Sequence, residues 1–83
     1  MEVCLITFRS VTPAQRAEQL LQKSGIRCAL QRTPRHMQEQ GCGYSLRLEM
    51  RDMGRATALL DGASVSYRKR YIRREAGQWE ELP

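Results

Sequence analysis

The sequence predicts an α+β fold, a ferredoxin-like β-α-β-β-α-β sandwich in which one antiparallel sheet carries two helices on one face. Three observations lead to this prediction. Residues 3–8 form a short apolar, β-branched run that is typical of a strand. Residues 14–21 and 53–60 repeat the same helical spacing of apolar side chains. Residues 44–50 alternate between apolar and polar side chains, as a strand does when one face of its sheet meets water.

The length of 83 residues suits one domain. We assign residues 1–76 to that domain and residues 77–83 to a polar C-terminal tail. The apolar N-terminal run lacks a basic start and a small-residue cleavage site, so it is read as a strand and not as a signal peptide. No segment has the length of apolar sequence that a membrane helix needs. The three cysteines are Cys4, Cys28 and Cys42. This odd number argues against a disulfide framework and for a reducing, cytoplasmic location.

The first half is expected to form a strand, a helix and a second strand. The first strand is followed by Thr12 as N-cap, Pro13 at the first helical position and Gln15 in a capping box. Gly25 is expected to end that helix. The segment 26–30 then alternates and predicts the second strand, with one face formed by Ile26, Cys28 and Leu30.

The second half is expected to repeat this order. In the strand 44–50, Leu46 and Leu48 are expected to face the core, and Ser45, Arg47 and Glu49 are expected to face water. Asp52 is placed as the cap of a second helix that ends at Gly62. The segment 65–72 is read as an edge strand. Its side chains Val65, Tyr67 and Tyr71 are expected to pack under the helices, with Lys69 as an interruption.

The net charge of +5 comes almost entirely from arginine. Such a charge permits binding to nucleic acid or to an acidic protein surface. The basic segment 67–74 contains interleaved tyrosines, but residues 44–50 have nothing like the glycine- and aromatic-rich pattern of the RNA recognition motif. Nucleic acid is therefore not expected as the partner, and the charged strand is read as a solvated edge.

The chemistry is expected in the long connection 33–43, because loops of this length are often functional. Gly41 and Gly43 flank Cys42, which frees the backbone and leaves the sulfur uncrowded. Three cationic side chains share the loop region: Arg32, Arg35 and His36. Cations and backbone N–H groups favour the thiolate form of cysteine. The alternative is that this segment is only a turn before a strand. Cys42 and His36 lack further ligands at a standard spacing, so no metal or other cofactor is expected.

The chain also resembles a family of small bacterial proteins of formerly unknown function, the selenium/sulfur carrier-like proteins. The resemblance covers roughly residues 2–72. It is carried by the apolar strand ending in Phe8, the helical Ala17, Glu18 and Leu20-Leu21, the segment Thr33-Pro34-Arg35, the segment Gly41-Cys42-Gly43, and Leu59-Leu60 in the second helix. It implies that Cys42 is the carrier thiol and that Pro34, Arg35 and Gly43 frame it.

Two functions are weighed. In the first, the Cys42 thiolate accepts sulfur or selenium as a persulfide or perselenide and passes it to an acceptor, as a carrier and not as a self-sufficient enzyme. Arg35 and Arg32 would stabilise the anionic cargo, and Gly41 and Gly43 would leave backbone amides open to it. The partners would be sulfur or selenium donor and acceptor proteins. In the second, the chain is a non-catalytic ferredoxin-like module that docks an acidic protein or nucleic acid through the basic edge strand. An exposed edge would also allow a homodimer.

Overall fold

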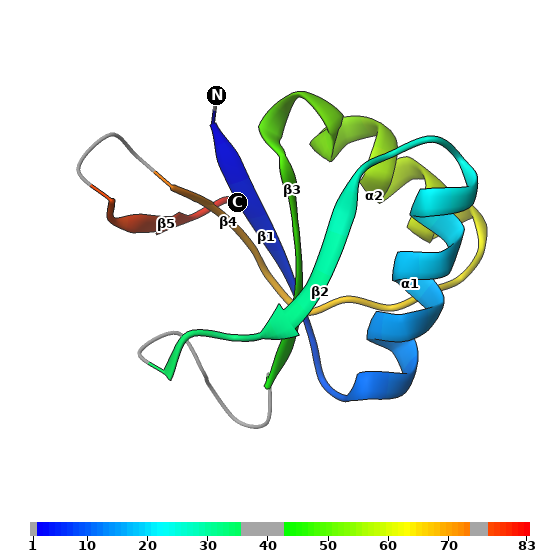
Figure 1. Cartoon of the computed structure of the whole chain (residues 1–83), viewed down its shortest axis with the longest axis horizontal. Helices are drawn as coiled ribbons and strands as arrows, with labels where there is room; N and C mark the ends of the chain where they lie inside the picture. Colours follow the sequence, from blue (N-terminus) through cyan, green and yellow to red (C-terminus); the bar gives the residue numbers. More distant parts are fainter. Residues whose placement is uncertain (1, 36–42, 74–76) are drawn as a thin grey trace.

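A single antiparallel sheet carries both helices on the same face in the computed structural model (Figure 1), which describes residues 2–35, 43–73 and 77–83. The strands are β1 (Val3–Phe8), β2 (Cys28–Arg32), β3 (Tyr44–Glu49), β4 (Arg70–Arg73) and β5 (Trp79–Glu81). The helices are α1 (Val11–Lys23) and α2 (Met53–Gly62), with a short 3-10 helix η2 (Met50–Asp52) before α2. The strand order is β2-β3-β1-β4-β5, and every neighbouring pair is antiparallel. The predicted ferredoxin-like α+β fold is confirmed.

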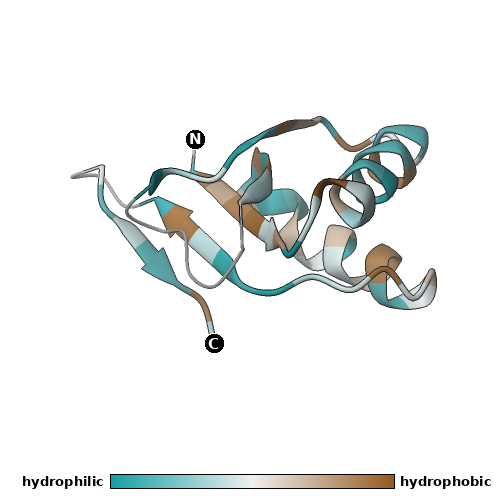
Figure 2. Cartoon of the chain, turned by 90° about the horizontal axis from the view of Figure 1, so that it is seen from below, coloured by the Kyte–Doolittle hydropathy of each residue, from teal (hydrophilic) through white to brown (hydrophobic). Residues whose placement is uncertain are grey.

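The main core lies between the sheet and the two helices. Figure 2 shows β1 as a largely hydrophobic strand, and its neighbouring side chains Leu5 and Ile6 are both fully buried although they lie on opposite faces of the sheet. The helices contribute their predicted apolar stripes, with Ala14, Ala17, Leu21, Met53, Ala56 and Leu60 buried. Leu46 and Leu48 of β3 belong to the same core. The predicted register of this strand is therefore confirmed.

The C-terminus of α1 is the one that the sequence predicts. Gly25 has a φ of 83°. Its N–H donates to the carbonyl of Gln22, and the N–H of Ile26 donates to the carbonyl of Leu21, which is the Schellman arrangement. The predicted N-terminus is wrong. α1 begins at Val11, two residues before the predicted start, because only Arg9 and Ser10 connect β1 to the helix. The N-cap residue Ser10 makes no side-chain capping bond.

Helix α2 ends in the same way but without a glycine. Ser64 has a φ of 57°, its N–H donates to the carbonyl of Asp61, and the N–H of Val65 donates to the carbonyl of Leu60. Gly62 is the last residue of α2, as predicted, and the left-handed residue that follows the helix is Ser64, two positions further on. Asp52 occupies the N-cap position but makes no side-chain capping bond.

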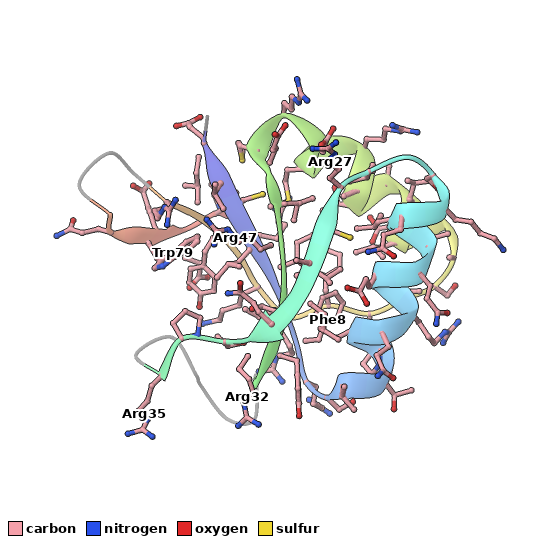
Figure 3. The ribbon with its side chains drawn as sticks, viewed as in Figure 1. Phe8, Arg27, Arg32, Arg35, Arg47 and Trp79 are labelled. Atoms are coloured by element: carbon pink, nitrogen blue, oxygen red, sulfur yellow. The ribbon has the colours of Figure 1, made fainter. Side chains whose placement is uncertain are left out.

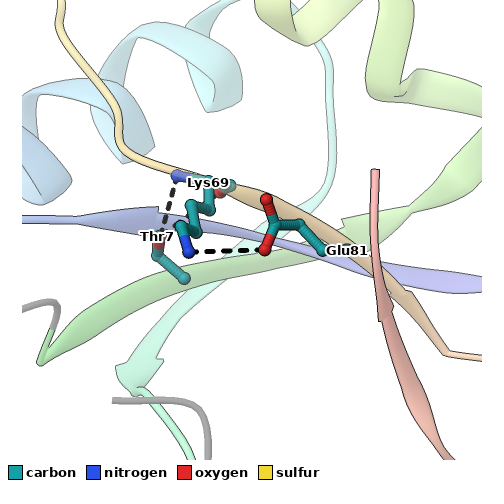
Figure 4. Close-up of polar contacts among 3 residues, drawn as sticks. All are labelled: Thr7, Lys69 and Glu81. Atoms are coloured by element: carbon teal, nitrogen blue, oxygen red, sulfur yellow. Dashed lines mark hydrogen bonds and ion pairs between the residues drawn. The ribbon is translucent and has the colours of Figure 1, made fainter. Parts of the chain in front are cut away.

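A β-bulge interrupts the pairing between β1 and the segment that leads into β4. Thr7 accepts the N–H of Arg68 at its carbonyl (2.8 Å) and donates its own N–H to the carbonyl of Lys69 (2.8 Å). Its Oγ1 accepts the N–H of Lys69 (3.0 Å; Figure 4). Two residues thus face one, which is the defining feature of a bulge and adds one residue to the alternation.

Because of the bulge, Tyr71 lies on the opposite face of the sheet from the one predicted. Val65 and Tyr67, which precede the bulge, pack on the helix side of the sheet. Tyr71 follows it and packs against Leu5 on the other face. A strict period of two carried through residues 65–72 therefore places Tyr71 on the wrong side.

β4 is an internal strand and not the predicted edge. Residues 77–83, expected to be a polar tail, contain β5, which pairs with the outer side of β4 through Tyr71 and Glu81. Trp79 packs against the Leu5 and Tyr71 pair. The polar composition hides this strand because most of its side chains remain exposed. The part of the basic segment that forms β4 is consequently flanked by β1 on one side and β5 on the other.

At the opposite side of the sheet, polar side chains of α1 occupy part of the edge of β2. A carboxylate oxygen of Glu18 accepts the N–H of Leu30 (3.1 Å), and the amide of Gln22 donates to the carbonyl of Cys28 (3.3 Å). Edge groups that are already bonded are poor templates for a further strand. The β2 edge is thus partly closed to pairing with a second chain.

Candidate functional site

The two ends of the predicted loop are held by paired backbone at one end of the sheet. The last register pair of β2 and β3 joins Arg32 to Tyr44, and the N–H of Thr33 donates to the carbonyl of Gly43 (2.9 Å) beyond it. Thr33 is only 2% exposed. This short ladder holds the two ends of the loop side by side.

The central site residue lies outside the described part of the chain. Residues 36–42 include His36, Gly41 and the proposed carrier thiol Cys42. The predictions for these three residues therefore stay predictions.

The described site residues occupy the two ends of this loop. Arg32 is the exposed last residue of β2, and its guanidinium lies 5.4 Å from the ring centroid of Tyr44. Arg35 is exposed, and Figure 3 shows both arginine side chains directed outward from the same end of the sheet. Pro34 is half-buried between them. The structure thus brings Arg32 onto Tyr44 but places Arg35 apart from this pair.

Gly43 does not use the conformational freedom that the sequence suggested. Its φ is not among the positive values of the described glycines, which are those of Gly25 and Gly77. A Cβ atom at Gly43 would meet nothing within 4 Å. Glycine at this position therefore leaves open space beside the loop base and does not relieve a strained backbone.

The two described cysteines are poor nucleophiles. Burial, with a smaller contribution from the charge of Asp52, raises the pKa of the Cys4 thiol from 9.0 to about 12. Burial, followed by the charge of Glu18, raises the pKa of the Cys28 thiol to about 11. The Cys4 thiol donates to the carbonyl of Leu48 (3.4 Å). The prediction that burial in the strands raises the pKa of both thiols is confirmed, although Cys28 is only half-buried.

A surface pocket of about 670 Å³ lies at the other end of β2, away from the loop. Its lining includes Arg27, Cys28 and Arg47. Because the Cys28 thiol stays protonated near neutral pH, the pocket offers no thiolate nucleophile. We therefore do not place the chemistry of the chain there.

Two features of the loop base escaped the sequence analysis. The stacking of Arg32 on Tyr44 follows from the pairing of β2 with β3, which the alternation alone does not align. Ser45, expected to face water, is fully buried, and its hydroxyl has no hydrogen-bond partner among the residues that the structure describes. Its neighbours in register are Thr7 and Gln31. No local signal marks such a residue, because its burial depends on the surrounding strands.

Among residues 2–35, 43–73 and 77–83, no group of three or more His, Cys, Asp or Glu side chains is placed to hold a metal ion. Within the same residues, neither helix is both long and apolar enough to cross a membrane.

Comparison with known proteins places the chain in a family. A family model described as "Putative Se/S carrier protein-like" matches residues 3–72. The match runs from the start of β1 into β4 and includes the whole connection between β2 and β3. Searches of the curated proteins and of the solved structures gave no match. Because the family model covers most of the chain, this protein belongs to the Se/S carrier protein-like family.

Proposed function

We propose that this protein carries sulfur or selenium on the thiolate of Cys42. The observation that carries the proposal is the family match, which spans position 42. The choice of cysteine is supported by the other two thiols, whose pKa values of about 12 and about 11 keep Cys4 and Cys28 protonated near neutral pH. A thiolate is the form that attacks sulfur, so Cys42 is the remaining candidate.

The transfer is a balanced thiol exchange. The Cys42 thiolate attacks the outer sulfur of a donor persulfide and forms a new S–S bond, while the old S–S bond breaks and its electron pair leaves with the donor thiolate. The cargo then resides on Cys42 as a persulfide, or as a perselenide when the outer atom is selenium. A thiolate of the acceptor repeats the same attack and restores Cys42. No external oxidant or reductant is consumed in either step.

The residues at the loop ends serve the anionic cargo. Arg32 and Arg35 are proposed to stabilise the persulfide charge, and Arg32 is supported in its position by the ring of Tyr44. Gly41 and Gly43 are proposed to leave backbone amides accessible, with Pro34 shaping the loop start. The partners are sulfur or selenium donor and acceptor proteins in a reducing cytoplasm.

The test is intact mass spectrometry after incubation with a cysteine desulfurase and cysteine, or with selenide and a persulfide donor. We expect the wild-type chain to gain the mass of one sulfur or one selenium atom and to lose it on treatment with dithiothreitol. Cys42→Ser should gain nothing. Cys28→Ser is the matched control and should load like the wild type. Loading that survives in Cys42→Ser, or that disappears only in Cys28→Ser, would overturn the assignment.

A further inference from the structure

Four arginines lie at the end of the sheet where the long connection between β2 and β3 begins and ends. Arg32 ends β2 and is in register with Tyr44, which is in register with Phe8. Arg9 follows Phe8 directly, and the N–H of Arg68 donates to the carbonyl of Thr7 one residue before it. Arg35 follows three residues after Arg32 (Figure 3). We call these four residues, Arg9, Arg32, Arg35 and Arg68, the arginine surface.

The arginine surface is compact because its members lie at the ends of adjacent strands. The strands β2, β3, β1 and β4 are neighbours in that order. With strands about 4.8 Å apart, three strand spacings separate Arg32 from Arg68, or about 15 Å. All four side chains are exposed. This width matches a patch of a protein surface and not a single small ligand.

The charge of the arginine surface is not compensated within the described residues. None of its four guanidinium groups has a salt bridge among these residues, and the described contact of Arg32 is with the ring of Tyr44. Lys69 is nearby but is paired with Glu81 (3.3 Å; Figure 4). Helix α1, which starts at this end, has no acidic residue in its first turn, so its N-terminus adds a partial positive charge.

The acidic side chains lie mostly elsewhere in the described chain. Glu2, Glu49 and Asp52 are at the opposite end of the sheet, before β1 and after β3. Glu18 is in the middle of α1 and is bonded to the backbone of Leu30. Asp61, in the last turn of α2, and Glu81, in β5 and paired with Lys69, are acidic residues of the described part that lie toward the arginine surface, and Glu80 precedes Glu81 in β5. Because Glu81 is already paired with Lys69, the four guanidinium groups of the arginine surface still outnumber the nearby carboxylates within the described residues.

We propose that the arginine surface docks an acidic patch on the protein that exchanges sulfur or selenium with this chain. This proposal rests on the proposed function, since it names the partner of the same loop. A planar guanidinium binds carboxylates through two parallel hydrogen bonds, and a complementary charge speeds encounter between transient partners. The docked partner would meet the chain at the end that carries the loop.

The same surface is poorly suited to nucleic acid. Proteins that bind single strands combine a basic groove with aromatic platforms on which bases stack. Tyr44 at the loop base is half-buried with Arg32 over its ring, and Tyr67, which precedes Arg68, is half-buried against the main core. Trp79 lies on the open sheet face at the other end of β4, with Arg73 over its ring. Within the described residues, the arginines therefore offer charge without an exposed aromatic ring beside them.

The experiment compares two anionic probes with matched charge. A fluorescent glutamate peptide of about ten residues and an oligouridylate of about the same length are titrated with the protein at low and at physiological salt. We expect tighter binding of the glutamate peptide. The double variant Arg9→Gln/Arg68→Gln should weaken that binding roughly five-fold, since exposed charge pairs contribute modestly and add over separate sites. These two arginines are not assigned to the cargo, so loading of Cys42 from inorganic polysulfide should be unchanged.

The matched control is Arg27→Gln/Arg47→Gln, which removes the same net charge from exposed positions outside the arginine surface. It should leave the affinity for the glutamate peptide within about two-fold of the wild type. Equal weakening by both double variants would show general charge attraction and overturn the docking surface. Tighter binding of the oligouridylate, or no binding of the glutamate peptide by the wild type, would also overturn it. Normal docking with failed loading from polysulfide would instead refute the proposed function.

Discussion

The relative reactivity of the three thiols is the sharpest test of the site. At pH 7, a thiol with a pKa of 9.0 is about 1% ionised, whereas a pKa of about 11 leaves about 0.01% for Cys28 and a pKa of about 12 leaves about 0.001% for Cys4. The more basic thiolates are intrinsically better nucleophiles. Compared with a thiolate of pKa 9.0, the thiolate of Cys28 should attack roughly 8-fold faster and that of Cys4 roughly 20-fold faster, which offsets part of the loss in ionised fraction. Even an unactivated Cys42 should therefore react roughly 10-fold faster than Cys28 and roughly 50-fold faster than Cys4.

The assay is reaction of the folded protein with 2,2′-dithiodipyridine, followed by peptide mapping at several times and pH values. The fully buried side chain of Cys4 should slow its reaction further. In urea, where burial is lost, the three thiols should react at similar rates. If Cys28 or Cys4 keeps pace with Cys42 in the folded protein, the argument from burial is wrong and Cys42 loses its support as the carrier thiol.

The remaining predictions concern the loop cation, two local structures and pH. Arg35→Ala should raise the apparent pKa of Cys42 in the same labelling assay, and an unchanged value would remove Arg35 from the site. Thr7→Val should destabilise the domain by about 1–3 kcal/mol, because it removes the hydroxyl that accepts the N–H of Lys69 in the bulge. In urea unfolding, Thr7→Val should lower the free energy of unfolding more than Thr7→Ser does, and the reverse order would contradict this role. Ser64→Gly should stabilise the domain by up to about 1 kcal/mol, since Ser64 has a φ of 57°; a lower unfolding midpoint would count against it. Stability should fall as the pH rises above 9, because the Cys4 thiol ionises in the unfolded chain at its ordinary pKa of 9.0 but stays protonated in the folded chain up to about 12. Cys4→Ala should have a smaller slope of unfolding free energy against pH between 9 and 11.

Several features of the fold follow from neighbouring residues alone. The alternation in residues 44–50 predicts β3 and its buried leucines, because the side-chain period of a strand is a local property. The repeated apolar spacing predicts α1 and α2 on one face of the sheet for the same reason. Gly25 marks the end of α1, since only the left-handed conformation at that position completes the terminal hydrogen bonds.

The predicted site is a mixture of residues that can be located and residues that cannot. Arg32, Pro34, Arg35 and Gly43 lie at the ends of the predicted loop, as their sequence positions require. The stacking of Arg32 on Tyr44 depends on the register of two strands. Cys42 and Gly41 are outside the described residues, so their place in the site is still a prediction.

The sequence by itself determined the fold class, the order of the first elements and the long connection between β2 and β3, because periodicity and glycine placement act within a few residues. Only the tertiary structure decided which face Tyr71 occupies, since the shift arises where Thr7 meets Lys69, 62 residues away. It also decided that β5 covers β4 and that Ser45 is buried. The arginine surface joins residues from three separate segments of the chain, and no local pattern brings such segments together, because strand pairing is chosen by the packing of the whole core.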